Sequence, residues 1–257
     1  MPKPAHIELT NGEQLPILYE DRSVLAIDKP AHWMLVPFSW QRTNRNLQAA
    51  IVSSIASGAF WARSRNIKFL RHVHRLDAET TGILLFARSM GALATYGDLF
   101  ESRKMEKAYL AVTEGIARQQ EWICQLRLAP DPDKIGRMTV DDETGKEAET
   151  SFRVLQTKEN RTLLEAKPFT GRTHQIRVHL ARSGHPVIGD DLYGKALPNA
   201  NSRQYPMALR AVSLAYSDPF TRRPVKITAP TSSFLREHGF AELSHTLPKP
   251  RDGTQSR

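Results

Sequence analysis

The chain has 257 residues, of which 40% are hydrophobic and 25% charged, so it can bury a sizeable core and has the charge content of an ordinary globular protein. Its net charge of +9 favours a polyanionic partner, nucleic acid first, although a merely basic surface would give the same balance. The single cysteine, Cys124, excludes an internal disulfide and a multi-cysteine zinc site, and it is typical of a reducing compartment.

Residues 1–15 are polar, contain proline and lack the apolar core of a signal peptide. No stretch of the chain approaches the roughly 18 apolar residues that a membrane helix needs, so we expect a cytoplasmic protein without a membrane partner. We interpret residues 1–15 as a flexible lead-in. Two short strands, 17–21 and 24–28, follow, and Lys29-Pro30 ends the second because proline cannot continue a central ladder. Lys29 is then either a phosphate contact or an exposed charge at a strand end.

A helix is predicted over 46–56, where apolar residues recur at helical spacing behind a capping Asn46. In residues 60–74, basic side chains alternate with aromatic ones: Trp61, Arg63, Arg65, Lys68, Arg71 and His72. This pattern suits a surface for single-stranded RNA, where rings stack on bases and cations meet phosphates, but it also fits a solvated basic loop. No cysteine or carboxylate cluster lies near His72 and His74, so we favour hydrogen-bonding roles over metal binding.

Asp77 stands in a loop that precedes a buried strand. The segment His74-Arg75-Leu76-Asp77-Ala78-Glu79-Thr80-Thr81-Gly82 runs into the apolar run 83–87, which fits a strand better than a helix. Leu76 should point into the core, while Arg75 and Asp77 leave on the opposite side. A loop fixed to a buried strand can hold a carboxylate at the edge of a cleft, so Asp77 is the candidate acid. The alternative is an ordinary loop carboxylate that caps the next element.

A second helix, 90–100 behind a capping Ser89, and a strand, 105–112, come next. Lys107 and Tyr109 share one face of that strand. Tyr109 could stack on a base and offer its hydroxyl for proton transfer, but a strand tyrosine usually fills a core. Further short strands are predicted at 122–126, 151–155 and 163–166, with charged, turn-rich hairpins between them.

The second informative segment is Phe169-Thr170-Gly171-Arg172-Thr173-His174-Gln175-Ile176-Arg177. Gly171 frees the backbone, Thr173 can cap, and a helix can run from His174 to Ser183. On this helix Arg177 could reach a carboxylate in bidentate fashion and keep it ionised, and we assign it to Asp77. The alternative is a surface arginine on an amphipathic helix.

Strands at 208–216 and 224–230 and a short helix at 232–238 complete the pattern, before a tail, 241–257, that we expect to be disordered. Many unevenly spaced strands without regular strand–helix alternation predict an α+β fold. We expect a single domain over 16–240, built on a mixed or mainly antiparallel sheet flanked by helices and loops.

The segment from His74 to Asp77, with Thr81-Gly82 and the apolar run after it, resembles the catalytic motif of the RluA-type pseudouridine synthases. Three further blocks resemble the family's other motifs, in the family's order: Asp28-Lys29-Pro30, Lys107-Ala108-Tyr109 and Gly171-Arg172-Thr173-His174-Gln175-Ile176-Arg177. Four ordered blocks across most of the chain are far more specific than any one of them.

The resemblance implies the pseudouridine synthase fold, a long bent sheet crossed by a cleft, and an isomerase that converts uridines of tRNA or rRNA to pseudouridine after flipping the base. Asp77 would act at the ribose, by adding to the sugar carbon or by removing a neighbouring proton. Tyr109 would line the uracil pocket and move the ring proton, and Arg177 would hold the acid ionised. The expected substrate and RNA contacts are Arg75, His74, Lys29, Lys107, Arg172, His174 and Thr81. We expect a monomer that needs no metal or other cofactor.

Two positions depart from the family's pattern. His32 stands where the family usually has a glycine, two residues after Pro30, and could alter the turn. Arg210 stands where relatives commonly have histidine, which puts any contact of that imidazole in doubt.

Two other functions fit parts of the sequence. An RNA-binding protein that keeps the scaffold without turnover would lack the Asp, Tyr or Arg, and all three are present. A base-excising glycosidase could also use an Asp beside a ribose. RNA mass separates the three, since isomerisation leaves it unchanged and excision removes a base. A zinc deaminase is excluded because its cysteine ligands are missing.

Overall fold

The computed structural model describes residues 2–35, 45–194 and 206–243 of the chain. Its strands are β1 (His6–Glu8), β2 (Gln14–Glu20), β3 (Val24–Lys29), β4 (Arg71–His72), β5 (Thr81–Ala87), β6 (Glu106–Glu114), β7 (Glu121–Cys124), β8 (Leu128–Pro130), β9 (Met138–Val140), β10 (Thr150–Lys158), β11 (Arg161–Pro168), β12 (Leu209–Ser217) and β13 (Pro224–Thr228). Its helices are α1 (Leu47–Ala56), α2 (Phe60–Arg63), α3 (Met90–Glu101), α4 (Gln175–Arg182) and α5 (Ser232–Glu237). The fold is α+β, as predicted.

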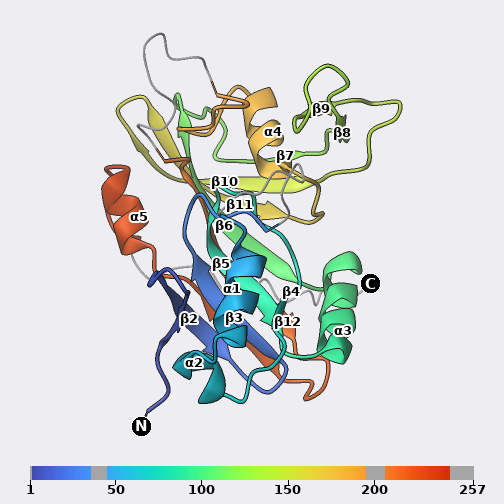
Figure 1. The fold of residues 1–257 in the computed structure, drawn as a ribbon. Helices are drawn as coiled ribbons and strands as arrows, with labels where there is room; N and C mark the ends of the chain where they lie inside the picture. Colours follow the sequence, from blue (N-terminus) through green and yellow to red (C-terminus); the bar gives the residue numbers. More distant parts are fainter. Residues whose placement is uncertain (1, 36–44, 195–205, 244–257) are drawn as a thin grey trace, which may run out of the picture.

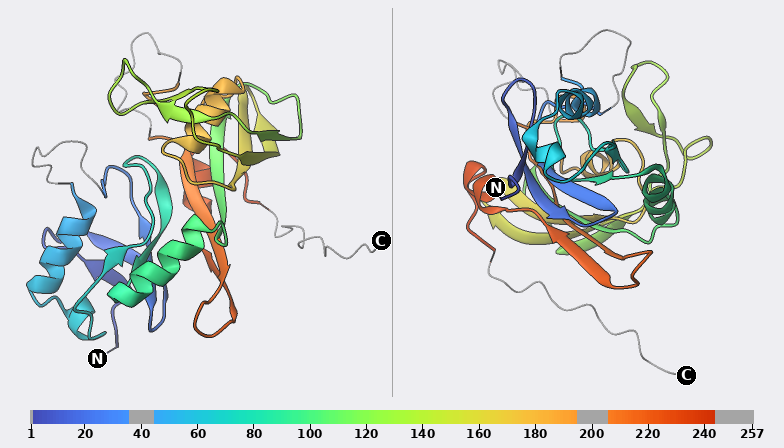
Figure 2. Two further views of the ribbon diagram at one scale, coloured as in Figure 1. Left: turned by 90° about the vertical axis from the view of Figure 1, so that its right-hand side faces the viewer. Right: turned by 60° about the horizontal axis from the view of Figure 1, so that its bottom comes forward.

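One long mixed sheet runs through the molecule in the order β1-β2-β3-β5-β12-β6-β11-β10-β7, with β4 beside β5 and β13 beside β12. Strands β8 and β9 form a separate hairpin. Helices α1, α2 and α3 surround the end of the sheet that carries β2 and β3, and α4 lies at the other end, near β8 and β9 (Figure 1). Strands β1–β3 and strands β11, β10 and β7 therefore occupy opposite ends of one sheet (Figure 2).

A short parallel seam joins the two halves of the sheet. Strands β5 and β12 pair through only two Cα partners, Arg210 with Thr81 and Ala211 with Gly82, whereas the other strand pairs of this sheet are antiparallel. Gly82 has a φ of +104°, and a Cβ there would lie 2.1 Å from the carbonyl oxygen of Ala211. Glycine is required at this position because any side chain would separate the strands.

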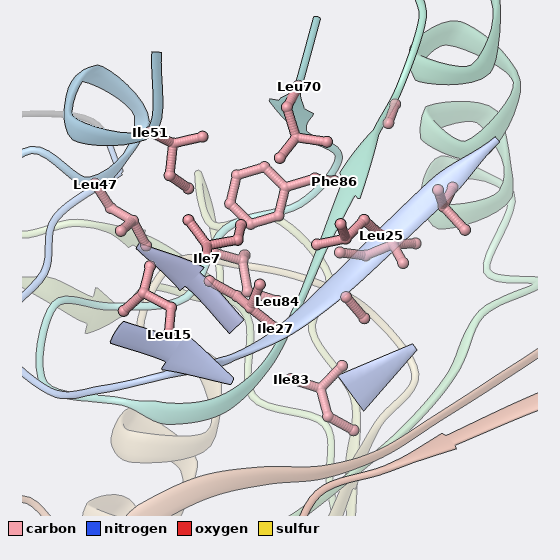
Figure 3. Packing of buried hydrophobic residues seen from close by; sticks show 14 of the residues in the cluster. Ile7, Leu15, Leu25, Ile27, Leu47, Ile51, Leu70, Ile83, Leu84 and Phe86 are labelled. Atoms are coloured by element: carbon pink, nitrogen blue, oxygen red, sulfur yellow. The ribbon is translucent and has the colours of Figure 1, made fainter. Parts of the chain in front are cut away.

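Each half of the sheet has its own hydrophobic core. The N-terminal core gathers residues of β1–β3, β5 and α1, including Ile27, Phe86 and Ile51, around the apolar run predicted as a strand (Figure 3). It also takes Leu214 and Ile227 from β12 and β13. The C-terminal core gathers residues of β6, β10, β11, α4 and α5. Tyr109 packs against both cores and so marks the boundary between the two halves.

Two of the three predicted helix caps, Asn46 and Ser89, are confirmed. Asn46 accepts a hydrogen bond from the Ala49 backbone N–H at 3.0 Å and begins α1, and Ser89 accepts one from Ala92 at 3.1 Å and begins α3. The predicted strands around the acid and the tyrosine are also confirmed as β5 and β6.

The expectation that residues 1–15 form a loosely attached lead-in is wrong. Strand β1 pairs antiparallel with β2, with Ile7 opposite Leu15, and both side chains are fully buried in the N-terminal core. Gly12, at a φ of +83°, lies in the turn between them. The domain therefore begins before residue 16, because two short apolar strands closed by a glycine turn are enough to form an edge hairpin.

The segment 60–74 is not the continuous basic surface that its composition suggested. Trp61 lies in the N-terminal core, and its indole N–H donates to the Glu8 carbonyl at 3.1 Å. Arg65 is buried, with its Nε 2.6 Å from a Glu20 carboxylate oxygen. Only Arg63, Lys68 and Arg71 of the listed side chains are exposed. His72 has the hydrogen-bonding role that was favoured, through its Nδ1 2.8 Å from the Gln48 side-chain oxygen.

The tail expected over 241–257 lies outside the described residues from 244 onward. Of the helices in the described ranges, none has both the length and the apolar character needed to span a bilayer.

Candidate active site

The acid loop, residues 73–80, connects β4 to β5 and carries Asp77. Leu76 is buried in the N-terminal core, as predicted, and anchors the loop from within. The Asp77 side chain is 24% exposed, so it can reach a ligand while its surroundings hold it. The Thr80 N–H donates to the Asp77 carbonyl at 3.2 Å, which tightens the turn before β5.

Lys29, at the end of β3, is neither a phosphate contact nor an exposed charge, so both predicted roles are wrong. Its side chain is fully buried, and Nζ donates to the carbonyls of Pro30, Ala78 and Thr80 at 2.9, 2.8 and 2.9 Å. Burial lowers the pKa of Lys29 to about 8, against the opposing charges of Glu79 and Asp77. Two of the three acceptors belong to the acid loop, so Lys29 fixes the backbone that holds Asp77.

Arg177, on α4, contacts two carboxylates. Its Nη1 donates to Asp77 Oδ2 at 3.0 Å, while Nε and Nη2 form a bidentate pair with Asp190 at 2.7 and 2.8 Å. The bidentate geometry predicted for Asp77 is thus made with Asp190, whose side chain is fully buried. Burial alone would lower the pKa of Arg177, but the hydrogen bonds and charges of Asp190 and Asp77 raise it, so the guanidinium stays charged.

His174 lies immediately before α4 in the left-handed region, with a φ of 54°, and caps no backbone group; Thr173, the predicted cap, is not the N-cap residue. The Nδ1 of His174 lies 2.9 Å from the Tyr193 hydroxyl, and its Nε2 lies 3.8 Å from Asp77 Oδ1. It is only 9% exposed, and burial lowers its pKa despite the charge of Asp77. His174 therefore lines the acid as a largely buried ring and not as an exposed RNA contact.

Tyr109 extends from β6 at the boundary of the two cores. Burial raises its pKa, and the charge of Asp77 raises it further, so the phenol keeps its proton at neutral pH. Its hydroxyl makes no hydrogen bond within the described part of the chain. Lys107, two residues earlier on the same face, donates from Nζ to the Thr170 carbonyl at 3.0 Å, and burial lowers its pKa to about 8. Lys107 was predicted to contact RNA, but its ammonium already donates a hydrogen bond to the loop before α4.

The other side chains predicted to contact RNA differ in whether they are exposed and free of partners. Arg75 is exposed beside Asp77 and has no side-chain partner among the described residues. His74 is not available: its Nε2 accepts from the Leu85 N–H at 3.2 Å, its ring stacks on Phe100 at 4.6 Å, and burial lowers its pKa to about 3. Arg172 donates from Nε to the Glu147 carbonyl at 2.9 Å. Thr81 begins β5 at the parallel seam and is half-buried.

The two residues that depart from the family's pattern, His32 and Arg210, both make defined contacts. His32 has a φ of 65°, so it keeps a backbone conformation that glycine favours, and its Nδ1 lies 2.7 Å from Glu79 of the acid loop. Arg210 donates from Nη2 to Asp28 at 2.6 Å and from Nε to the Pro230 carbonyl at 3.0 Å. Asp28, Lys29 and His32 thus tie the end of β3 to β12 and to the acid loop.

The sequence predicted no role in the site for two of its residues, Asp190 and Tyr193. Both belong to the turn Gly189-Asp190-Asp191-Leu192-Tyr193-Gly194, where Asp190 Oδ1 also accepts from the backbone N–H groups of Leu192 and Tyr193. A buried arginine needs more carboxylate than one partly exposed acid supplies, and this signal can be read only once Arg177 is known to be buried. Within the described ranges, no group of three or more His, Cys, Asp or Glu side chains is placed to hold a metal ion.

The arrangement brings together a partly exposed carboxylate, a permanently charged guanidinium and a protonated phenol, from β4–β5, α4 and β6. The carboxylate can act as nucleophile or base, and the phenol can donate or relay a proton. Asp190 holds the guanidinium independently of Asp77, so Asp77 can change its charge or bonding without releasing Arg177.

Residues 23–182 match the family described as RNA pseudouridylate synthase. The chain is 31% identical over 227 residues to ribosomal large subunit pseudouridine synthase C of Vibrio vulnificus, covering 86% of this chain and 67% of that protein. It is 33% identical over 219 residues to the uncharacterized RNA pseudouridine synthase YhcT of Bacillus subtilis, covering 84% of this chain and 68% of that protein.

Among solved structures, human RNA pseudouridylate synthase domain containing 1 is similar in fold. It aligns with a TM-score of 0.67 at 25% identity, over 89% of this chain and 86% of that chain.

Proposed function

The chain belongs to the RNA pseudouridylate synthase family, isomerases that act on RNA, and we propose that it converts a uridine of large-subunit ribosomal RNA to pseudouridine in the cytoplasm. The names of several relatives support the ribosomal target over transfer RNA, the other substrate considered from the sequence. The carrying observation is the contact of Arg177 Nη1 with Asp77 Oδ2 at 3.0 Å, made while the acid is still 24% exposed.

The reaction breaks the bond between the ribose and uracil N1, turns the ring, and joins the ribose to C5, whose proton leaves while N1 gains one. The base must first leave its stack, at a cost of a few kcal/mol that phosphate contacts elsewhere offset. Arg75, exposed beside the acid, is the side chain that takes the space left by the base.

Asp77 acts at the ribose by one of two routes, addition to the sugar carbon or removal of a neighbouring proton. Both need an ionised carboxylate, and the Arg177 guanidinium supports that state through a charge-assisted hydrogen bond. Deuterium at the ribose C2′ separates the routes: a primary isotope effect on turnover selects proton removal, and its absence selects addition.

Tyr109 faces the detached uracil and relays the C5 proton, which its hydroxyl can accept only as the hydroxyl's own proton passes on. The raised pKa of the phenol supports a role as stacking platform in the resting state, because the protonated ring carries no charge that would repel Asp77. Tyr109→Phe should therefore keep RNA affinity and strongly reduce turnover. Normal turnover in this variant would leave the tyrosine only a stacking role.

The direct test of the function is Asp77→Asn, assayed on unmodified large-subunit ribosomal RNA. We expect the variant to form no pseudouridine and to bind the RNA within a few-fold of wild type, since the amide keeps the shape of the acid and loses its charge. Asp98→Asn, an exposed aspartate on α3, is the matched control and should be fully active. Pseudouridine formation by Asp77→Asn would remove the acid from the mechanism, and a change in RNA mass would point to excision.

The target position follows from comparing pseudouridine maps of cellular RNA with and without the gene. Loss of a pseudouridine from large-subunit ribosomal RNA is the expected result, and loss confined to transfer RNA would contradict the proposed substrate.

A further inference from the structure

A cavity of about 240 Å³ lies between the β8–β9 hairpin and α4, and Asp77 is not among its lining residues. The hairpin and the helix lie side by side at the same end of the sheet (Figure 1). The apolar side chains of Met138, Val178 and Ala181 line the cavity. Two arginines, Arg137 and Arg182, and one tyrosine, Tyr193, line it as well. Pockets that enclose a small-molecule ligand are larger, from about 300 Å³, so this cavity suits a small anionic group better than a free nucleotide.

The two arginines are available to an anion. Arg182 ends α4, is exposed, and has no hydrogen-bond or ion-pair partner in the described ranges. Arg137 has one weak partner, Asp131, whose carboxylate oxygen lies 3.7 Å from Nε, and its side chain is one-third exposed. A guanidinium offers several N–H groups in one plane and matches phosphate oxygens well, so one distant carboxylate leaves Arg137 with donors to spare.

Tyr193 forms a wall that the cavity shares with the acid's surroundings. The guanidinium carbons of Arg137 and Arg177 lie 5.3 and 5.2 Å from the centre of its ring. Its hydroxyl accepts from the Met138 N–H at 2.7 Å and contacts His174 Nδ1 at 2.9 Å. One side chain, Tyr193, therefore separates the cavity from the Arg177 that contacts Asp77.

We propose that this cavity binds a backbone phosphate of the RNA strand next to the flipped uridine, with Arg137 and Arg182 as its ligands. The inference rests on RNA as the substrate. A strand whose uridine reaches Asp77 can continue past Tyr193, which lies between Arg177 and the cavity, and a phosphate in the cavity would fix its register without reading its sequence. The subsite therefore contributes to affinity and register and takes no part in the chemical step.

The test measures binding of a nine-nucleotide oligouridylate by fluorescence anisotropy at several salt concentrations. The double variant Arg137→Ala/Arg182→Ala should bind roughly fivefold more weakly at low salt, and the slope of log affinity against log salt should fall by about 0.7, the value for one phosphate of a single strand. Ala181→Glu keeps both arginines and places a carboxylate in the cavity, so it should weaken binding at least as much.

Arg236→Ala is the matched control, because it removes an exposed arginine from α5, away from the β8–β9 hairpin (Figure 1). It should leave both affinity and salt slope unchanged. Thermal melting of each variant checks the fold, and Arg182→Gln, a change at an exposed side chain, replaces the double variant if that one melts early.

Unchanged affinity and slope in both the double variant and Ala181→Glu would overturn the subsite, as would reduced turnover at saturating RNA with unchanged affinity. The affinity and the salt slope do not depend on catalysis. A wild-type protein that binds oligouridylate with the expected arginine dependence but leaves ribosomal RNA unmodified would refute the proposed function and support the subsite.

Discussion

The two halves of the sheet position their parts of the site in different ways. The N-terminal half presents Asp77 on a loop, and three contacts immobilise that loop: Leu76 from within, the Lys29 ammonium beneath and His32 at the rim. The C-terminal half presents Tyr109 and Arg177 on a strand and a helix, where regular structure already fixes them. The position of the acid thus depends on contacts from outside its loop, whereas regular structure fixes the backbone that carries its two partners.

The two halves meet at the seam between β5 and β12, so breaking the seam should have the largest effect. Gly82→Ala places a Cβ against the Ala211 carbonyl at a positive φ, and we expect it to lower the free energy of unfolding by roughly 3–5 kcal/mol. Urea denaturation measures this. Gly97→Ala on α3 is the control, since a Cβ there meets nothing within 4 Å, and it should be neutral or stabilise by up to about 1 kcal/mol. Equal stabilities would show that the seam tolerates a side chain.

The fixed C-terminal partners are tested by Asp190→Asn, which keeps the shape of the turn and removes half of the bidentate pair. Arg177 should then shift toward Asp77, and we expect turnover to fall by roughly tenfold to a hundredfold, since misplacement by about 1 Å is enough for such a loss. RNA affinity should change little. Asp191→Asn alters the exposed neighbour and should remain active. Unaltered turnover in Asp190→Asn would mean that α4 alone orients the guanidinium.

His32→Gly tests how the N-terminal half holds the acid loop, and we expect it to have the smallest effect. The change removes the contact with Glu79, but both of those side chains are well exposed, at 61% and 36%, and such pairs contribute about 0–1 kcal/mol. Glycine also relieves the positive φ, so stability should stay within about 1 kcal/mol and turnover within a few-fold. A loss as large as that of Asp190→Asn would make His32 a principal holder of the loop.

The sequence predicted the elements whose physical signals are local. The apolar run after Gly82, the capping Asn46 and Ser89, and the helix that carries Arg177 are all present. The hairpin of β1 and β2 was missed because its apolar residues are few, and because Trp61 and Arg65, which donate to the Glu8 and Pro4 carbonyls, lie far along the chain.

The site was predicted in part for the same reason. Asp77 and Arg177 are in contact, as the resemblance implied, and their catalytic roles remain predictions. Lys29 was misjudged because a strand-end lysine looks like a surface charge unless the carbonyls of the acid loop are known to lie beneath it. Asp190 was passed over because the need for a second carboxylate appears only when Arg177 is seen to be buried.

The seam between β5 and β12 also affects the order in which the chain can fold during synthesis. Gly82 is made early and Ala211 late, and the N-terminal core takes Leu214 and Ile227 from strands that follow the seam. Contacts this distant in sequence form slowly, and a nascent chain reaches them only near the end of synthesis. Until then the core beneath Asp77 is incomplete. We therefore expect a chain still held by the ribosome that makes it to be inactive toward RNA nearby, and activity to arrive with the closing strands.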